Sequence, residues 1–207
     1  MTVIMLNDMG ILADSVRYYH DADAFTAANL YYVPHAGSYH CDESYGMQRD
    51  YLDICQMLVV DEGELSVTYR GETRTAGPGS LVLLDCREAH SYHAVTPIRM
   101  RWFHFEGSGS TAYTQLILNT HGFILPTGQN AEIDECIRRI IRPRELCKME
   151  NALCHFHHLF FFCVAVADDR HLDLIRCIGD RMQPLLRECE QNNAACLRNL
   201  NAGRDVL

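Results

Sequence analysis

The stretch that decides the fold is residues 63–107, which reads GELSVTYRGETRTAGPGSLVLLDCREAHSYHAVTPIRMRWFHFEG. Apolar and polar residues alternate along Leu65–Tyr69, and this pattern stops at Arg70-Gly71. We expect a tight hairpin turn there, followed by a returning strand over Thr73–Ala76. Short alternating runs rich in β-branched and aromatic residues are typical of strands rather than helices. The stretch therefore predicts strands joined by tight turns.

The same pattern extends from about Asn29 to Glu106. Gly77-Pro78-Gly79 forces a turn, because Pro cannot donate to a strand ladder and Gly tolerates positive φ. Further strands are predicted at Leu52–Val60, Ser80–Leu84, His90–Val95 and Arg99–Phe105. Strands at this spacing favour an antiparallel sandwich or barrel.

After the break at Gly107-Ser108-Gly109-Ser110, the apolar residues recur at the longer spacing that is typical of helices. We expect a helix over Thr111–Thr120 that begins at a Ser or Thr cap, and an amphipathic helix over Asn130–Ile141. Longer helices are predicted at Glu145–Ala167 and Asp173–Gln191. The predicted fold class is mostly β with C-terminal helices, namely a barrel over residues 1–110 followed by about three α-helices in residues 111–207.

Composition excludes several classes of function. Of 207 residues, 48% are hydrophobic and 22% charged, which is typical of a globular chain, and the formal net charge of -9 argues against DNA binding by this chain alone. The ten cysteines form no C-x-x-C, and no signal peptide is visible, so we expect a reduced, cytoplasmic protein. The longest apolar run, Leu159–Ala167, is less than half of the about twenty residues that a membrane span needs.

Catalytic motifs are not evident. The chain has no G-x-S-x-G elbow, no P-loop and no G-x-G-x-x-G that opens a helix. Metal-binding barrels carry an H-x-H pair with a carboxylate and a later histidine, but no H-x-H precedes Gly63, and only His90 falls where a late ligand is expected. We attribute His155 and His158, one helical turn apart, to a buried or dimer-facing seam. The expectation is no catalytic metal, no cofactor and no enzyme.

The stretch 63–107 resembles the N-terminal cupin-like sensor domain of AraC-type transcription regulators. The shared features are the strand ending in Gly, the hairpin, the Pro-Gly turn before Leu-Val-Leu-Leu, the H-x-Y of His90-Ser91-Tyr92 and the W-x-H-F-x-G of residues 102–107. Ser80 and Cys86 depart from the Asp and Pro that are frequent in that family. The resemblance implies a jelly-roll pocket for a small effector, often a sugar as in arabinose-binding domains, and helices that pair two subunits.

On a strand, Met100, Trp102 and His104 point to one face, so that Trp102, the only tryptophan, can face the barrel interior beside Tyr92 and His90. An indole with nearby phenol and imidazole groups suits a sugar ring. Trp102 as plain core, and His104 as a satisfied core histidine, remain alternatives. Arg49 is either the anchor of a polar or anionic ligand group or a plain surface residue.

The resemblance also implies a DNA-binding half that this chain lacks, because only some 35 residues follow Asp173. We interpret the chain as a fragment that reaches DNA only through the missing part; the alternative is a natural remnant that keeps only the sensor and dimerisation parts. Phe160-Phe161-Phe162 either pairs two copies or packs within the chain. The expected function is non-catalytic sensing of a small molecule by a homodimer. The alternatives are a metal-dependent cupin enzyme and an oligomerisation module with a filled barrel.

Overall fold

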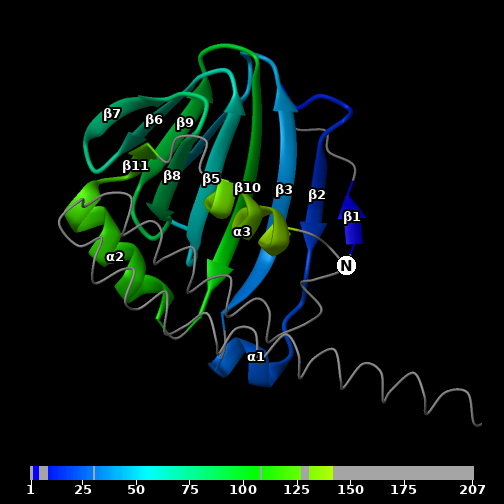
Figure 1. Ribbon diagram of the computed structural model, residues 1–207, viewed down its shortest axis with the longest axis vertical. Coiled ribbons are helices and arrows are strands. Elements are labelled where there is room, and N and C mark those ends of the chain that lie inside the picture. The colour runs from blue at the N-terminus through cyan, green and yellow to red at the C-terminus, as the bar shows by residue number, and fades with distance from the viewer. Residues whose placement is uncertain (1, 5–8, 30, 108, 127–130, 142–207) are drawn as a thin grey trace, which may run out of the picture. The chain divides into compact units, whose positions relative to one another are not determined.

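The computed structural model describes residues 2–4, 9–29, 31–107, 109–126 and 131–141 (Figure 1). Contacts divide the chain into two compact units, Met1–Ala167 and Asp168–Leu207, and every described residue belongs to the first. The strands are β1 (Thr2–Ile4), β2 (Val16–Tyr19), β3 (Tyr32–Cys41), β4 (Gly46–Arg49), β5 (Cys55–Glu62), β6 (Leu65–Tyr69), β7 (Glu72–Ala76), β8 (Ser80–Asp85), β9 (His90–Ala94), β10 (Ile98–Glu106) and β11 (Ile124–Pro126). The helices are α1 (Ala24–Asn29), α2 (Ser110–His121) and α3 (Ala131–Ile141).

The strands form two antiparallel sheets. One has seven strands in the order β1-β2-β3-β10-β5-β8-β11, and the other has four in the order β4-β9-β6-β7. The two sheets face each other as in a sandwich, and the buried apolar residues form a single core to which both sheets and the helices α2 and α3 contribute. The prediction of a mostly β, jelly-roll barrel followed by helices is confirmed for the described residues.

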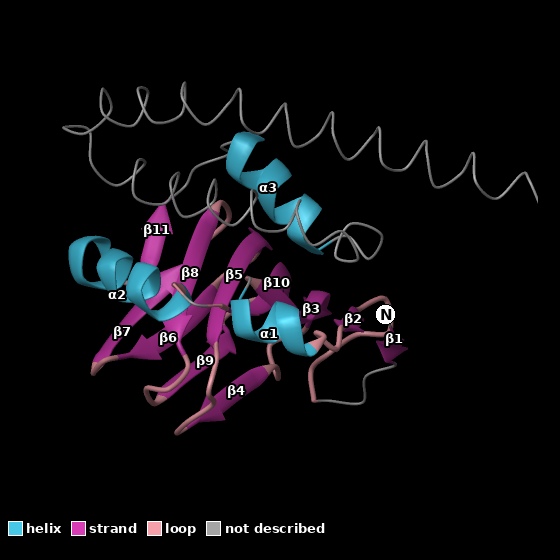
Figure 2. Cartoon of the chain, turned by 90° about the horizontal axis from the view of Figure 1, so that it is seen from below, coloured by secondary structure: helices cyan, strands magenta, loops and turns pink. Residues whose placement is uncertain are grey.

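The strand β10 is central to the larger sheet because it pairs with β3 on one side and β5 on the other. Trp102 lies opposite Gly37 of β3 and Leu58 of β5. The residues Trp102, Phe103, His104 and Phe105 are all buried, so both faces of this strand are covered. Its inner face looks toward the smaller sheet, and its outer face lies under the helices (Figure 2).

The helices α2 and α3 cover the outer face of the seven-stranded sheet. The helix α2 packs against β8, whose continuous apolar run is buried along its length because it is covered on both sides. On α3, Ile133, Ile137 and Ile140 are buried, as the predicted amphipathic period requires. Arg101 of β10 fixes α3 by pairing with Asp134 at 2.6 Å.

The predicted hairpin is confirmed. Tyr69 pairs with Glu72 across a two-residue turn in which Arg70 and Gly71 both have positive φ, 53° and 78°. This turn geometry matches the right-handed twist of the flanking strands, and Gly at the second position adopts it without strain. The strand β7 is the edge of its sheet, and its Glu, Thr and Arg side chains are exposed.

Several boundaries differ from the predictions. The strand predicted from Leu52 begins at Cys55, because Ile54 N–H donates to Leu52 O and turns the chain there. The helix α2 has no Ser or Thr cap: its N-cap is Gly109, and the Ser110 hydroxyl donates to Gly107 O. The strands β1 and β2 and the helix α1 were not predicted. The predicted helices Glu145–Ala167 and Asp173–Gln191, with His155, His158 and the three phenylalanines, lie outside the described residues.

We predict that Gly63→Ala destabilises the fold more than Gly77→Ala. Gly63 has φ 82°, and a Cβ there would lie 2.2 Å from Pro97 O, whereas a Cβ at Gly77 meets nothing within 4 Å. The strain and the clash should lower the free energy of unfolding by about 2–4 kcal/mol at Gly63, against about 0.5 kcal/mol or less at Gly77. Urea denaturation measures both, and equal losses would contradict the prediction.

Candidate functional site

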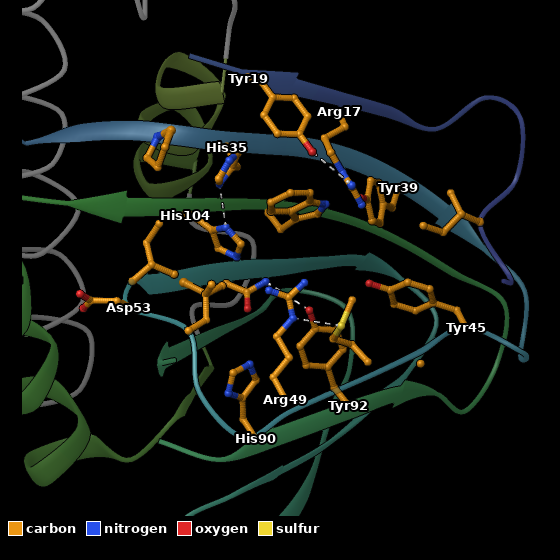
Figure 3. A pocket seen from close by; sticks show the side chains of 18 of the residues that line it. Arg17, Tyr19, His35, Tyr39, Tyr45, Arg49, Asp53, His90, Tyr92 and His104 are labelled. Atoms are coloured by element: carbon orange, nitrogen blue, oxygen red, sulfur yellow. Dashed lines mark hydrogen bonds between the residues drawn. The ribbon is translucent and has the colours of Figure 1, made fainter. Parts of the chain in front are cut away.

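A cavity of about 840 Å³ lies between the two sheets. Its walls come from β2, β3, β5 and β10 of the larger sheet and from β4 and β9 of the smaller one (Figure 3). Exposed residues at its edge, among them Met9 and Asp53, mark where it meets solvent. A volume of this size is typical of small-molecule pockets in proteins.

Five of the six side chains that were predicted to bind a ligand line this cavity: Arg49, His90, Tyr92, Trp102 and His104. Arg49 and Tyr92 come from the smaller sheet, and Trp102 and His104 from β10. The sixth, Met100, is 1% exposed within the core and does not line the cavity. On β10 it lies opposite Tyr39 of β3 and Val60 of β5. The role of these residues in ligand binding stays a prediction.

The cavity is lined by an almost continuous chain of aromatic rings. Successive centroids lie 4.8 to 6.4 Å apart in the order Tyr19, His35, His104, Trp102, Tyr39, Tyr45, Tyr92 and His90. Figure 3 shows the first members on the wall of the larger sheet and the last on the facing wall. Such a lining offers flat apolar surfaces together with hydroxyl and ring-nitrogen groups at the rims.

The indole of Trp102 packs against the backbone of β3. A Cβ built on Gly37 would lie 2.8 Å from Trp102 Nε1, so only glycine leaves room for this ring. Trp102 is 6% exposed, and its Nε1 has no hydrogen-bond partner among the described residues. Trp102 thus presents a ring to the cavity and keeps a buried donor unsatisfied, which is costly in the absence of an acceptor.

Arg17 and Tyr39 form a second group that the sequence analysis did not single out. Arg17 Nε donates to Tyr39 Oη at 2.7 Å, and Nη1 reaches Tyr19 Oη at 3.4 Å. The guanidinium also lies over the rings of Tyr39 and Trp102, at 5.7 and 5.8 Å from their centroids. The sequence could have indicated this group, because residues 17 and 19 of a strand over Val16-Arg17-Tyr18-Tyr19 lie on one face.

Three histidines in the cavity are held in the neutral form. Burial lowers the pKa of His104 to about 3, with further lowering by His35 and the nearby arginines. Burial also lowers the pKa of His35 and of His90, and Arg49 acts in the same direction on both. His104 Nδ1 faces His35 Nδ1 at 3.4 Å, and His90 Nδ1 lies 2.9 Å from Glu88 O. Neutral imidazoles supply directional hydrogen bonds without adding charge.

The described residues contain no group of three His, Cys, Asp or Glu side chains that could hold a metal ion. The His35 and His104 ring nitrogens face each other from the larger sheet, whereas His90 lies on β9 of the smaller sheet and its Nδ1 is bonded to Glu88 O in the turn before that strand. The donor set in this part of the chain therefore does not fit the convergent ligands that a catalytic metal needs.

The AraC-like ligand binding domain family matches the chain over residues 32–146, more than half of its length. The chain belongs to this family. The match begins at the first residue of β3, so it includes every strand of this AraC-like domain that lines the cavity except β2. Among the described residues of the domain, no helix is long and apolar enough to cross a membrane.

Solved structures resemble parts of the AraC-like domain at low identity. The protein YhaK from Escherichia coli is 13% identical with a TM-score of 0.40, over 45% of this chain and 44% of YhaK, so the chain spans under half of that protein. The cupin domain of an XRE family transcriptional regulator from Enterobacter cloacae is 18% identical with a TM-score of 0.34, over 44% and 94%. A mutant oxalate decarboxylase from Bacillus subtilis is 12% identical with a TM-score of 0.38, over 51% and 28%. No curated protein matches the chain significantly.

We predict that the AraC-like domain loses stability as pH falls from 6.5, the ordinary pKa of histidine, toward 3. In that window His104 takes up a proton in the unfolded chain but stays neutral in the folded one, so protonation favours unfolding. His104→Gln should flatten part of this dependence. The free energy of unfolding against pH checks it, with His93→Gln on the exposed side of β9 as the control. A pH profile that His104→Gln leaves unchanged would contradict the assignment.

Proposed function

We propose that this AraC-like domain is a non-catalytic sensor that binds a small effector, of sugar size, in the cavity between its sheets. The observation that carries the proposal is the position of Trp102, whose ring faces a cavity of about 840 Å³. We further propose that the chain pairs as a homodimer through the helices predicted after residue 141. DNA contacts would then belong to a part of the protein outside this chain.

The polar groups of the cavity support a sugar-like effector. The Gln56 amide donates to Tyr92 Oη at 3.4 Å, which leaves the phenol proton available for a ligand oxygen. Together with the neutral His90 and His104, this places hydroxyl and imidazole groups around a flat indole surface. Stacking on an aromatic ring combined with directional hydrogen bonds is suited to hydroxylated rings.

The cavity also favours a sensor over the two alternatives. A pure pairing module has no need of an open volume lined by polar groups, since native cores are packed at crystal-like density. A metal-dependent enzyme needs three or four convergent ligands, and among the described residues no third His, Cys, Asp or Glu joins the paired Nδ1 atoms of His35 and His104. Binding without catalysis is therefore the function that the described residues support best.

We predict that an effector changes the fluorescence of Trp102 in a saturable way. Because Trp102 is the only tryptophan of the chain, its emission reports on the cavity alone. A panel of neutral monosaccharides and sugar acids should contain at least one compound that also raises the melting temperature by mass action. Tyr92→Phe should weaken that binding about 2- to 12-fold, the value of one hydrogen bond.

Tyr51→Phe is the matched control, because Tyr51 is 63% exposed and does not line the cavity. It removes the same hydroxyl and should leave binding unchanged. Equal effects of the two substitutions would contradict the placement of the effector. Stoichiometric iron, manganese or nickel in the purified protein would instead support the enzyme.

We predict a dimer in solution. Sedimentation equilibrium of the whole chain over a range of concentrations should fit twice the mass of 23.6 kDa. Exposed apolar side chains that pair two copies become buried in the dimer, which favours association. A single species at 23.6 kDa up to the highest concentration would contradict the pairing.

A further inference from the structure

The cavity holds a guanidinium that no carboxylate neutralises within the described part of the chain. Arg49 ends β4 and lies opposite His90 of β9, and its guanidinium lies between the two walls (Figure 3). Its Nε donates to Met47 Sδ at 3.2 Å, a weak acceptor, and no ion pair with a described carboxylate is formed. The side chain is half-buried. A partly desolvated cation of this kind gains more from an anionic partner than a surface arginine does.

The two carboxylates that line the cavity are engaged elsewhere. Asp53 Oδ1 accepts from Arg87 Nε at 2.7 Å, and Glu106 Oε2 accepts from Tyr32 Oη at 2.7 Å. Asp53 also lies at the solvent-exposed edge, where its side chain is 71% exposed. Neither of them is therefore placed to neutralise Arg49 from inside.

A second unsatisfied donor lies in the wall of the cavity. Trp102 Nε1 is a buried donor without a partner among the described residues, and indole nitrogen cannot accept. Arg49 also lowers the pKa of His35, His90 and His104, although burial is the larger cause at each. The positive field of its guanidinium therefore reaches both walls of the cavity.

We propose that the effector is an anion, a hydroxylated ring that carries a carboxylate, and that Arg49 binds the carboxylate while Trp102 supports the ring. This proposal rests on the sensor function above and specifies its ligand class. A guanidinium fork matches a carboxylate in a bidentate pair, and the charge of one group balances that of the other. Arg17 is already bonded to Tyr39 and Tyr19, so its hydrogen-bonding capacity is partly used. Arg49 is hydrogen-bonded through Nε, so its terminal nitrogens can form the fork that a carboxylate matches.

The test compares matched pairs of compounds that differ in one group. Trp102 fluorescence is titrated with D-galactose and D-galacturonate, with D-glucose and D-glucuronate, and with D-galactose 1-phosphate. At least one acid should bind ten-fold or more tightly than its neutral partner. That preference should shrink as salt is added, because screening weakens ionic attraction but leaves stacking unchanged.

Three variants test whether the positive charge of Arg49 causes the preference for the acid. Arg49→Met keeps a long stem without the charge and should reduce the preference for the acid to within about two-fold of unity, since the ion pair is lost. Arg49→Lys keeps the charge without the fork and should retain an intermediate preference. Arg74→Met is the matched control, because Arg74 lies on the exposed edge strand β7, pairs with Glu72 and does not line the cavity. Melting curves of each variant verify that it folds.

The outcomes separate this proposal from the sensor function. A neutral sugar that binds as tightly as its acid, with Arg49→Met unchanged, would overturn the anionic effector and leave the sensor in place. Tighter binding of the sugar phosphate than of the acid would overturn the carboxylate assignment. No saturable change with any compound of the panel would overturn both proposals. An acid preference that disappears in Arg49→Met but persists in Arg74→Met supports the assignment.

Discussion

The burial of both faces of β10 is the constraint on which the site depends. Trp102 and His104 look inward, whereas Arg101, Phe103 and Phe105 lie on the outer face that the helices cover. Since side chains alternate along a strand, a slip of one residue would exchange these two sets. The register is held by shape, because Gly37 of β3 lies opposite Trp102 and only glycine admits the indole there.

The same burial determines the charge of the cavity. Removing an imidazole from water disfavours its protonated form, so the pKa of His104 falls to about 3 and the pKa values of His35 and His90 fall as well. A guanidinium does not respond in this way, because it keeps its proton at any pH at which the protein folds. Arg17 and Arg49 therefore remain the positive charges of the cavity while the histidines contribute polarity only. A ligand in the cavity therefore meets the positive charges of Arg17 and Arg49 and uncharged hydrogen-bonding groups elsewhere.

The sequence predicted those parts of the fold that are determined by residues close together along the chain. Arg70-Gly71 indicates a hairpin on its own, and the alternation around Trp102 places His104 on the same face without knowledge of any partner strand. Arg17 and Tyr39 join the site only through the long-range pairing of β2 with β3, which no local pattern contains. Whether the Arg49 side chain points into the cavity depends in the same way on the pairing of β4 with β9. Met100 shares the face of Trp102, yet the cavity ends before it, because the depth of a cavity is a property of packing.

A sensor also needs a connection between its ligand and the surface that the rest of the protein reads. Trp102 lines the cavity, and the adjacent Arg101 is 17% exposed on the opposite face, where it pairs with Asp61 of β5 and with Asp134 of α3 at 2.6 Å each. Arg101 and Trp102 are consecutive residues of β10, so one wall of the cavity and the residue that fixes α3 share the backbone of one strand. Coupling requires that the ligand favour one arrangement of this anchor over another. The alternation of β10 thus connects the cavity to α3 through the backbone of this strand and the ion pair between Arg101 and Asp134.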